Sequence, residues 1–328
     1  MKRLPLLLGI LLLFAACEKD IEFNGEVTNP LMVINSLVAQ DSLFEIKVTK
    51  SRFFMQYEDT FETVKNATVE LYVNGVLSET MTHAGNGRYT SNYKVTDGDL
   101  IRIVSQAPDL KTTTAEMRVA PVADVVKLDT TMVIHSRYPI INYPYYGESN
   151  ASVYDTIGWT TYCTINCKLT FRDPPGSENF YRLIVSNKKQ YDYYSVNHVR
   201  YKKDDLVFGE KEQNSGGIID EGGSNTYGTF TNELFEGKTY PLTFSFDVSY
   251  TYYLDSIQEG GFNRSENAEY VIDLQTLSKS YYLYLITSSK YSSDDMFAEP
   301  VQIHSNVIGG TGIVGNYSHR LIPLKLSF

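Results

Sequence analysis

The sequence predicts an all-β protein with two domains: an N-terminal immunoglobulin-like β-sandwich, then a larger β-sandwich or barrel-like domain that carries one amphipathic helix. Three observations support this fold class. Segments such as 44–49 and 67–73 alternate between apolar and polar residues, which marks strands with one exposed face. Turn-forming pairs such as Asn74-Gly75 separate these segments. The 26 tyrosines suit half-buried strand positions.

The N-terminal domain is predicted to span residues 29–121. About seven short strands within roughly 100 residues are typical of an immunoglobulin-like sandwich. Turn residues at 85–87 and 97–99 separate the later strands, and Pro121 ends the domain. The clearest strands are expected at 31–34, 44–49, 67–73, 76–77, 100–104 and 112–119.

The C-terminal domain is predicted to span residues 122–328. Its first part, 122–160, is less regular, and its tyrosines and prolines around 138–147 predict a loop. A segment rich in Gly, Ser and Asn predicts a mobile loop over 214–228. Between these loops, strands are expected at 164–171, 180–186, 191–201 and 240–253.

One segment of the C-terminal domain has the spacing of a helix instead. Over 274–290, apolar or aromatic residues fall on one helical face, and Asp273 or Thr276 is the expected N-cap. This stripe is more typical of a buried core face than of a ligand site. It consists of Leu274, Leu277, Tyr281, Tyr284 and Leu285.

Residues 1–16 have the features of a lipoprotein signal peptide. Lys2 and Arg3 precede an apolar run over 4–14, which is shorter than the roughly 20 residues that a membrane span needs. Phe14-Ala15-Ala16-Cys17 resembles the bacterial lipobox, with Phe where Leu is usual. Cys17 is therefore the predicted lipidation site, and the alternative is an ordinary cleaved signal. Several acyl chains on one residue give stable anchoring.

Residues 17–28 are predicted to form an acidic tether. The stretch Glu18-Lys19-Asp20-Ile21-Glu22 resembles the signal that sends Bacteroidota lipoproteins to the outer face of the outer membrane. We therefore expect a lipid-anchored protein of the outer membrane that faces the cell exterior. The alternative is a solvated tether without export information, since short charged runs are usually that.

The formal charge of −10 excludes some partners. A strongly acidic chain does not favour nucleic acid, whose phosphates need a basic patch. It does not favour attraction to anionic lipid head groups either. The expected contact with the membrane is therefore the lipid anchor.

Cys163 and Cys167 are the two cysteines that follow the anchor. In a straight strand, positions four apart lie about 13 Å from one another, which is too far for a disulfide. A disulfide between them would need a turn at 164–166. Two buried free thiols are an equally good interpretation, and neither a second Cys pair nor a His pair has the spacing for a metal site.

A search for catalytic motifs finds no set of residues that would carry chemistry. Gly310-Thr311-Gly312-Ile313-Val314-Gly315 matches a dinucleotide-binding pattern, but no helix or acidic residue follows at the required distance. These glycines are expected to permit a tight turn or bulge. The five histidines show no paired spacing, and the pattern G-x-S-x-G is absent. We therefore expect neither catalysis nor a cofactor nor a metal.

Tyrosine-rich loops are the best candidates for ligand or partner binding. Exposed aromatic rings can stack on sugars or fill a partner's pocket. The alternative is that half of each group faces the core. The first group is Tyr138, Tyr143, Tyr145 and Tyr146, and the second is Tyr191, Tyr193, Tyr194 and Tyr201.

Several segments in order resemble the domain of unknown function 4249 family of Bacteroidota lipoproteins. The resemblance spans nearly the whole chain after the signal peptide. The segments are Cys17-Glu18-Lys19, Leu31-Met32-Val33-Ile34-Asn35, Asn66-Ala67-Thr68-Val69, Phe171-Arg172-Asp173-Pro174, Asn179-Phe180-Tyr181-Arg182, Ser280-Tyr281-Tyr282, Glu299-Pro300-Val301, Ser305-Asn306-Val307 and 312–318.

This resemblance implies an accessory lipoprotein near a TonB-dependent outer-membrane transporter, with a part in nutrient capture or uptake. The expected function is therefore non-catalytic binding of a glycan or peptide. One alternative is a structural or assembly component of the cell envelope with no small-molecule ligand. A hydrolase is the other alternative, and it would need a cleft that gathers two carboxylates or a Ser-His pair.

Overall fold

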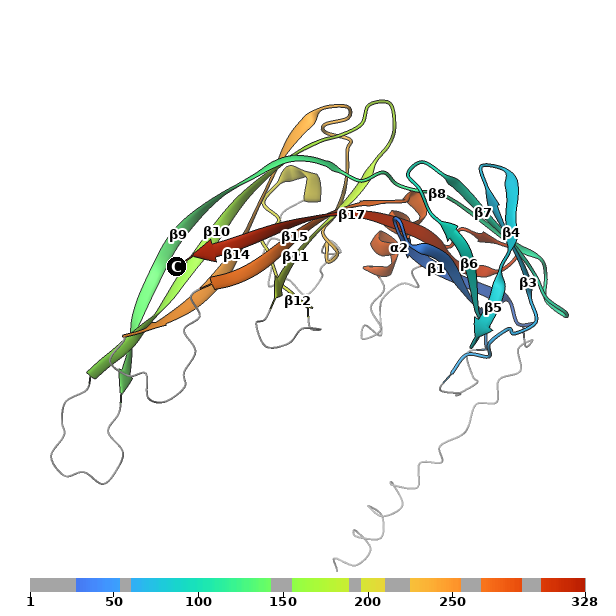
Figure 1. The fold of residues 1–328 in the computed structure, drawn as a ribbon, viewed down its shortest axis with the longest axis horizontal. Coiled ribbons are helices and arrows are strands. Elements are labelled where there is room, and N and C mark those ends of the chain that lie inside the picture. The colour runs from blue at the N-terminus through green and yellow to red at the C-terminus, as the bar shows by residue number, and fades with distance from the viewer. Residues whose placement is uncertain are drawn as a thin grey trace, which may run out of the picture.

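The computed structural model is built mostly of β-strands, which confirms the predicted all-β class (Figure 1). It describes residues 28–53, 60–142, 155–188, 196–209, 225–254, 267–290 and 302–327. In these residues the one α-helix is α2 (Lys279–Ser288). No helix in the described part of the chain has the length and apolar character needed to cross a bilayer.

The first eight strands form most of the N-terminal sandwich. Asn74 and Gly75 have φ angles of 51° and 85°, as a two-residue hairpin turn requires, so the hairpin predicted there is confirmed. The strands are β1 (Met32–Ala39), β2 (Leu43–Lys50), β3 (Thr68–Val73), β4 (Val76–Thr80), β5 (Thr82–Gly85), β6 (Arg88–Lys94), β7 (Leu100–Gln106) and β8 (Thr113–Arg118).

The remaining elements build the C-terminal sandwich and return to the first one. They include one 3₁₀ turn, η1. They are β9 (Asp124–Asn142), β10 (Asp155–Arg172), β11 (Phe180–Lys188), β12 (Val196–His198), η1 (Leu206–Phe208), β13 (Thr229–Thr231), β14 (Thr239–Tyr253), β15 (Asn267–Leu277), α2, β16 (Val307–Ile308) and β17 (Thr311–Ser327).

The strands form three sheets. A nine-stranded sheet has the order β12-β11-β15-β17-β1-β2-β6-β5, with β13 paired to β11. A five-stranded sheet, β16-β8-β7-β3-β4, packs on one half of it, and a three-stranded sheet, β14-β10-β9, packs on the other half. Each pair of faces encloses its own apolar core, so the nine-stranded sheet is shared by two sandwiches (Figure 1).

Strand β17 joins the two sandwiches. Its first half runs parallel to β1, with Thr311 opposite Val33, and its second half runs antiparallel to β15. Val314 therefore lies in the N-terminal core, and Leu324 lies in the C-terminal core. The division of the chain at residue 121 stays a prediction, but the segment 29–121 does not supply the whole first sandwich, because β16 and β17 complete it.

Asn316 on β17 fixes the junction by hydrogen bonds. Its side-chain oxygen accepts from the backbone N–H of Ala120, in the connection between the sandwiches, at 2.8 Å. Its side-chain N–H donates to the carbonyl oxygen of Val38, and its backbone N–H donates to Ser278 Oγ at 3.0 Å. Since Asn316 is fully buried, these bonds replace the water it would otherwise bind.

The glycines near the start of β17 allow its close approach to β1. Gly312 has a φ of 120°, and a Cβ there would collide with the carbonyl oxygen of Ile34. A Cβ at Gly310 would collide with the carbonyl oxygen of Met32 in the same way. Gly310 lies in the turn before β17, as expected, whereas Gly312 lies within a strand whose register on β1 shows no bulge.

Two predictions for the C-terminal half were wrong. The segment 122–160, which was predicted to be less regular, contains the 19-residue strand β9. Pro139 is tolerated in this strand because β9 lies at a sheet edge. The helix begins at Lys279 and not near residue 274, because Leu274 continues strand β15. Its N-cap is Ser278, whose side chain accepts from the backbone N–H of Tyr281. The loop predicted at 214–228 lies largely outside the described residues.

Replacing Gly312 by Ala should destabilise the protein by roughly 2–4 kcal/mol, through the left-handed φ and the collision with β1. Gly176→Ala is the matched control, because Gly176 has a φ of 76° but open space around it, and should cost about 1 kcal/mol. Denaturant unfolding measures both. Equal losses would show that the contact with Ile34 does not constrain β17.

Candidate functional site

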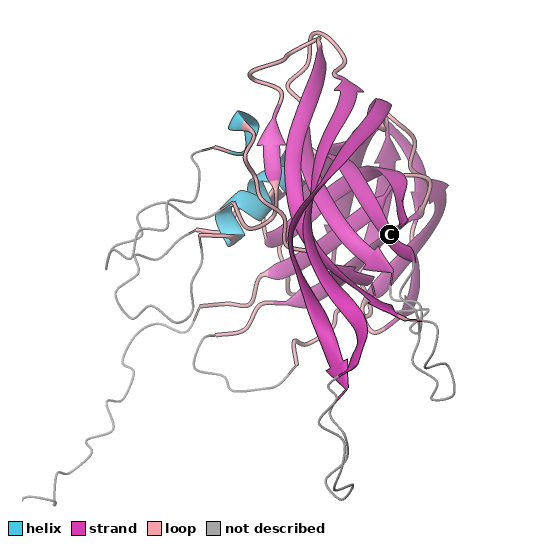
Figure 2. Ribbon diagram, turned by 90° about the vertical axis from the view of Figure 1, so that its left-hand side faces the viewer, coloured by secondary structure: helices cyan, strands magenta, loops and turns pink. Residues whose placement is uncertain are grey.

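The candidate site lies on the outer face of the three-stranded sheet, whose long strands stand at the front of Figure 2. Alternation along β10 sends Cys163, Ile165 and Cys167 into the core. The same alternation turns Tyr162 and Thr164 to the other face. Fifteen register pairs join β10 to β14, from Gly158 opposite Tyr253 to Arg172 opposite Thr239, so this face is carried on a continuous ladder.

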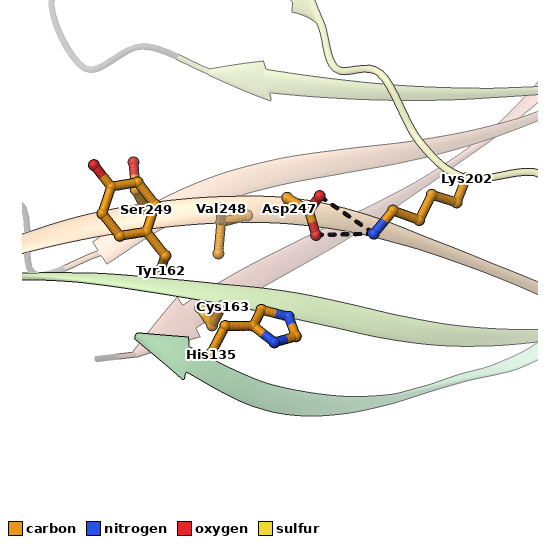
Figure 3. Close-up of a pocket in the computed structure, with 7 residues that line it drawn as sticks. All are labelled: His135, Tyr162, Cys163, Lys202, Asp247, Val248 and Ser249. Atoms are coloured by element: carbon orange, nitrogen blue, oxygen red, sulfur yellow. Dashed lines mark hydrogen bonds and ion pairs between the residues drawn. The ribbon is translucent and has the colours of Figure 1, made fainter. Parts of the chain in front are cut away.

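A row of polar side chains crosses this face, strand by strand. His135 on β9 lies 2.6 Å from Thr164 on β10, through Nε2 and Oγ1. Thr164 Oγ1 donates to Asp247 on β14 at 2.5 Å. Lys202 pairs with Asp247 at 3.3 Å, from a segment whose backbone bridges to Ser245 on β14 (Figure 3).

A β-bulge places His135 in this row. The register of β9 on β10 shifts between Tyr162, opposite Ser136, and Cys163, opposite Ile134. His135 is therefore the extra residue of the bulge, and bulges re-aim side chains in this manner. Its ring thus reaches Thr164 on the outer face.

The direction of the hydrogen bonds follows from the charge of Asp247. A carboxylate only accepts, so Thr164 uses its hydrogen for Asp247 and must accept the bond from His135 Nε2–H. The bond from Thr164 is the main cause that holds the pKa of Asp247 below its ordinary value, and Lys202 lowers it further, while burial acts in the opposite direction. Asp247 therefore stays ionised at neutral pH.

Two adjacent hollows open along this row. The first has a volume of about 470 Å³ and is lined by His135, Tyr162, Cys163, Lys202, Asp247, Val248 and Ser249. Figure 3 shows Tyr162 and Lys202 toward opposite ends of it. The second has a volume of about 400 Å³, shares Lys202 and Asp247, and adds Arg200 together with Val199, Tyr201 and Phe246. The shared residues make the two hollows one continuous surface with polar and apolar lining.

Tyr162 lines the first hollow and forms an aromatic pair with Tyr138. Tyr138 is 58% exposed, Tyr162 is 47% exposed, and their rings meet edge to face at 6.0 Å between centroids. Tyr138 was a predicted binding residue, and it lies on strand β9 and not in a loop. The other tyrosines of the prediction and the predicted lipidation site lie outside the described residues: Tyr143, Tyr145, Tyr146, Tyr191, Tyr193, Tyr194 and Cys17. Tyr201 is half-buried against the C-terminal core.

Cys163 and Cys167 are both free thiols. They lie four residues apart in the unbroken strand β10, so the turn that a disulfide would need is absent there, and the disulfide left open by the sequence is not formed. Burial raises the pKa of Cys163, and Asp247 contributes to that rise. Burial alone raises the pKa of Cys167 to about 12. Both thiols therefore stay protonated and unreactive at neutral pH.

Iodoacetamide at pH 8 should leave Cys163 and Cys167 unmodified in the native protein, because both thiols are buried and their pKa values are raised. Both should be alkylated after unfolding without reductant, as measured by peptide mass spectrometry. Modification that appears only after reduction would instead show a disulfide between them.

Other polar clusters serve the fold. Asp173 is buried, and its carboxylate accepts from Asn179 and Asn232, from Tyr181 and from the backbone N–H of Gly237. Burial, and then the bond to Asp173, raise the pKa of the Tyr181 hydroxyl well above its ordinary value. Since Asp173 is buried and its carboxylate oxygens are already bonded within the protein, this cluster stabilises the fold.

Asp204 and Asp205 are adjacent acidic residues, but only Asp204 is exposed. Asp205 caps η1 and accepts hydrogen bonds from Tyr240 and Thr243, so it is used by the fold. Asp204 is exposed.

In the described residues, no group of three or more His, Cys, Asp or Glu side chains could hold a metal ion.

Sequence reasoning missed most of the site. Tyr162, Thr164, Asp247 and Lys202 come from separate strands, and only their register brings them together. The one available signal was alternation, which predicts an outward Thr164 on a strand whose Ile165 is buried. The bulge that aims His135 leaves no recognisable trace in the sequence.

Comparison with known proteins identifies a family. The sequence model described as "Domain of unknown function (DUF4249)" matches residues 18–320, nearly the whole chain, which confirms the family predicted from the sequence. A search of curated proteins finds no match.

One similar solved structure is from Corynebacterium diphtheriae and is described as a "putative membrane anchored protein". It shares 10% sequence identity with a TM-score of 0.19, and the similarity covers 85% of this chain and 58% of that one. The chain thus spans less than two thirds of that protein, and so low a TM-score supports no argument about fold or function.

Proposed function

We propose that this chain, which belongs to the DUF4249 family, is a non-catalytic lipoprotein that binds a glycan or peptide on the outer face of its three-stranded sheet. The observation that carries this proposal is the combination of an exposed aromatic pair, Tyr138 and Tyr162, with the polar row that begins at His135. Binding sites for small molecules commonly combine an aromatic surface with a few fixed polar groups.

The direction of the hydrogen bonds in the row supports binding over catalysis. A nucleophilic hydroxyl must give its hydrogen to a neighbouring base. The Thr164 hydroxyl gives its hydrogen to Asp247, whose lowered pKa makes the carboxylate a weak base, and it receives one from His135, so His135 does not serve as its base. The row therefore suits hydrogen bonding to a ligand.

The proposed anchor is a lipid on Cys17. Lys2, Arg3, the short apolar run and the lipobox-like residues before Cys17 support this assignment. The acidic residues of 18–22 favour the outer face of an outer membrane. The resemblance from which the family was first inferred adds an accessory role beside a TonB-dependent transporter, in nutrient capture or uptake.

Replacing Tyr162 by Ala should weaken ligand binding about tenfold, because an aromatic contact contributes about 0.5–1.5 kcal/mol beyond burial. A panel of glycans and peptides, titrated by calorimetry, supplies the ligand and the affinities. Phe61→Ala is the control, since Phe61 is an exposed ring on the N-terminal sandwich, 54% accessible. Equal affinities for both variants would remove this face from the proposal.

A structural role in envelope assembly is the second candidate function. The long edge strand β9 favours it, because β9 pairs with β10 alone in the described residues and exposes apolar side chains. Ile134 is 60% exposed, and Val126 and Val133 are also exposed. Long apolar edge strands are sites where another chain adds a strand, and isolated proteins usually protect them.

Pull-down of the tagged lipoprotein in mild detergent distinguishes the two functions. Recovery of a β-barrel transporter supports the accessory role. Recovery of a different stable partner, lost in Ile134→Lys but kept in the exposed-site control Ile308→Lys, supports assembly through β9, because an edge lysine blocks strand addition. Recovery of the lipoprotein alone counts against both.

A further inference from the structure

The second hollow adds a cation to the candidate site. In the segment 199–202, Val199 and Tyr201 pack against the C-terminal core. Arg200 and Lys202 alternate with them and therefore point to the outer side, and all four residues line the second hollow. Arg200 is exposed and forms no ion pair with the described residues, so its guanidinium is available to a ligand.

The charge of the two hollows differs from that of the whole chain. The chain carries a formal charge of −10, but the hollows are lined by Arg200 and Lys202 against the single carboxylate of Asp247. Asp204, the nearest exposed carboxylate along the chain, lines neither hollow. An acidic ligand repelled by most of this surface is thus attracted here.

The ion pair between Lys202 and Asp247 can accommodate such a ligand. Both side chains are more than half exposed, at 57% and 63%, and exposed pairs of this kind contribute about 0–1 kcal/mol. Lys202 can therefore turn from Asp247 to a ligand carboxylate with little loss of stability. Arg200 offers the forked donor geometry that matches a carboxylate in two hydrogen bonds.

The groups at the other end of the surface suit a sugar. Tyr162 presents an exposed ring, and His135, Asp247 and Ser249 place polar side chains around the first hollow. A sugar ring has an apolar face for the tyrosine and hydroxyls for these groups. From β9 to the segment of Lys202, the row spans three strand spacings, or about 14 Å, which exceeds one sugar ring.

We propose that the two hollows bind an acidic glycan, with a carboxylate held by Arg200 and Lys202 and a sugar ring against Tyr162. This inference rests on the proposed function and names the ligand class of the same site. The ligand's carboxylate supplies the specificity, and Tyr162, His135 and Ser249 of the first hollow hold the adjoining ring.

The test uses the full mature chain and matched pairs of probes. Oligosaccharides of galacturonate, glucuronate and mannuronate are titrated by calorimetry beside their methyl esters, which keep the backbone and lose the charge. At least one acid should bind about tenfold more tightly than its ester. Arg200→Gln should weaken binding of that acid about tenfold and leave the ester unchanged. Lys168→Gln, an exposed cation on the same sheet that lines neither hollow, should change neither.

The other outcomes overturn the inference in separate ways. Equal affinity for acid and ester, or binding of neutral glycans alone, rejects the carboxylate but leaves the proposed function standing. Tighter binding of a polyglutamate peptide, lost in Arg200→Gln, identifies a peptide ligand and rejects the glycan. Binding of neither glycans nor peptides rejects this inference and the proposed function together.

Discussion

The pairing of β17 with both β1 and β15 is the constraint on which the rest of the structure depends. One strand contributes Val314 to the first core and Leu324 to the second, so each sandwich lacks part of its main sheet without it. The parallel pairing with β1 joins the two ends of the described chain. Such contacts form only after a long loop has closed, so the N-terminal sandwich cannot be completed until the last strand arrives.

This dependence explains why small and polar residues gather at the junction. Gly310 and Gly312 let the two backbones approach, and Asn316 then holds the connection at Ala120 and the cap of α2 at Ser278. Asn316, Ala120 and Ser278 are buried, and an unpaired polar group there would cost roughly 1–3 kcal/mol. The two sandwiches are therefore joined by a satisfied polar network and a shared sheet, and α2 begins where that network ends.

The sequence predicts local features well and long-range ones poorly. The hairpin at Asn74-Gly75 depends on two left-handed residues, and strands such as β7 depend on their own alternation, so both can be recognised locally.

Strand β9 was missed because an edge strand exposed on most of its length loses the alternation that burial imposes, and it contains Pro139. The helix was placed too early because Leu274 and Leu277 fit a helical stripe, although the ladder with β11 and β17 keeps them in a strand. The candidate site depends on register across several strands, for which one sequence offers no signal.

The residues that carry the family resemblance and those that form the candidate site are almost entirely different. Asp173, Asn179 and Tyr181 form one buried network, and Asn306 bonds across the start of β17 to the backbone of Val314. By contrast, His135, Thr164, Lys202 and Asp247 lie on the outer face, outside the quoted segments. The side chains of that face can change without disturbing either core, because alternation separates them from Cys163, Ile165 and Phe246 beneath. The segments that carry the family resemblance therefore lie in the scaffold of two sandwiches closed by β17, and the proposed ligand site is formed by side chains that this scaffold presents on its outer face.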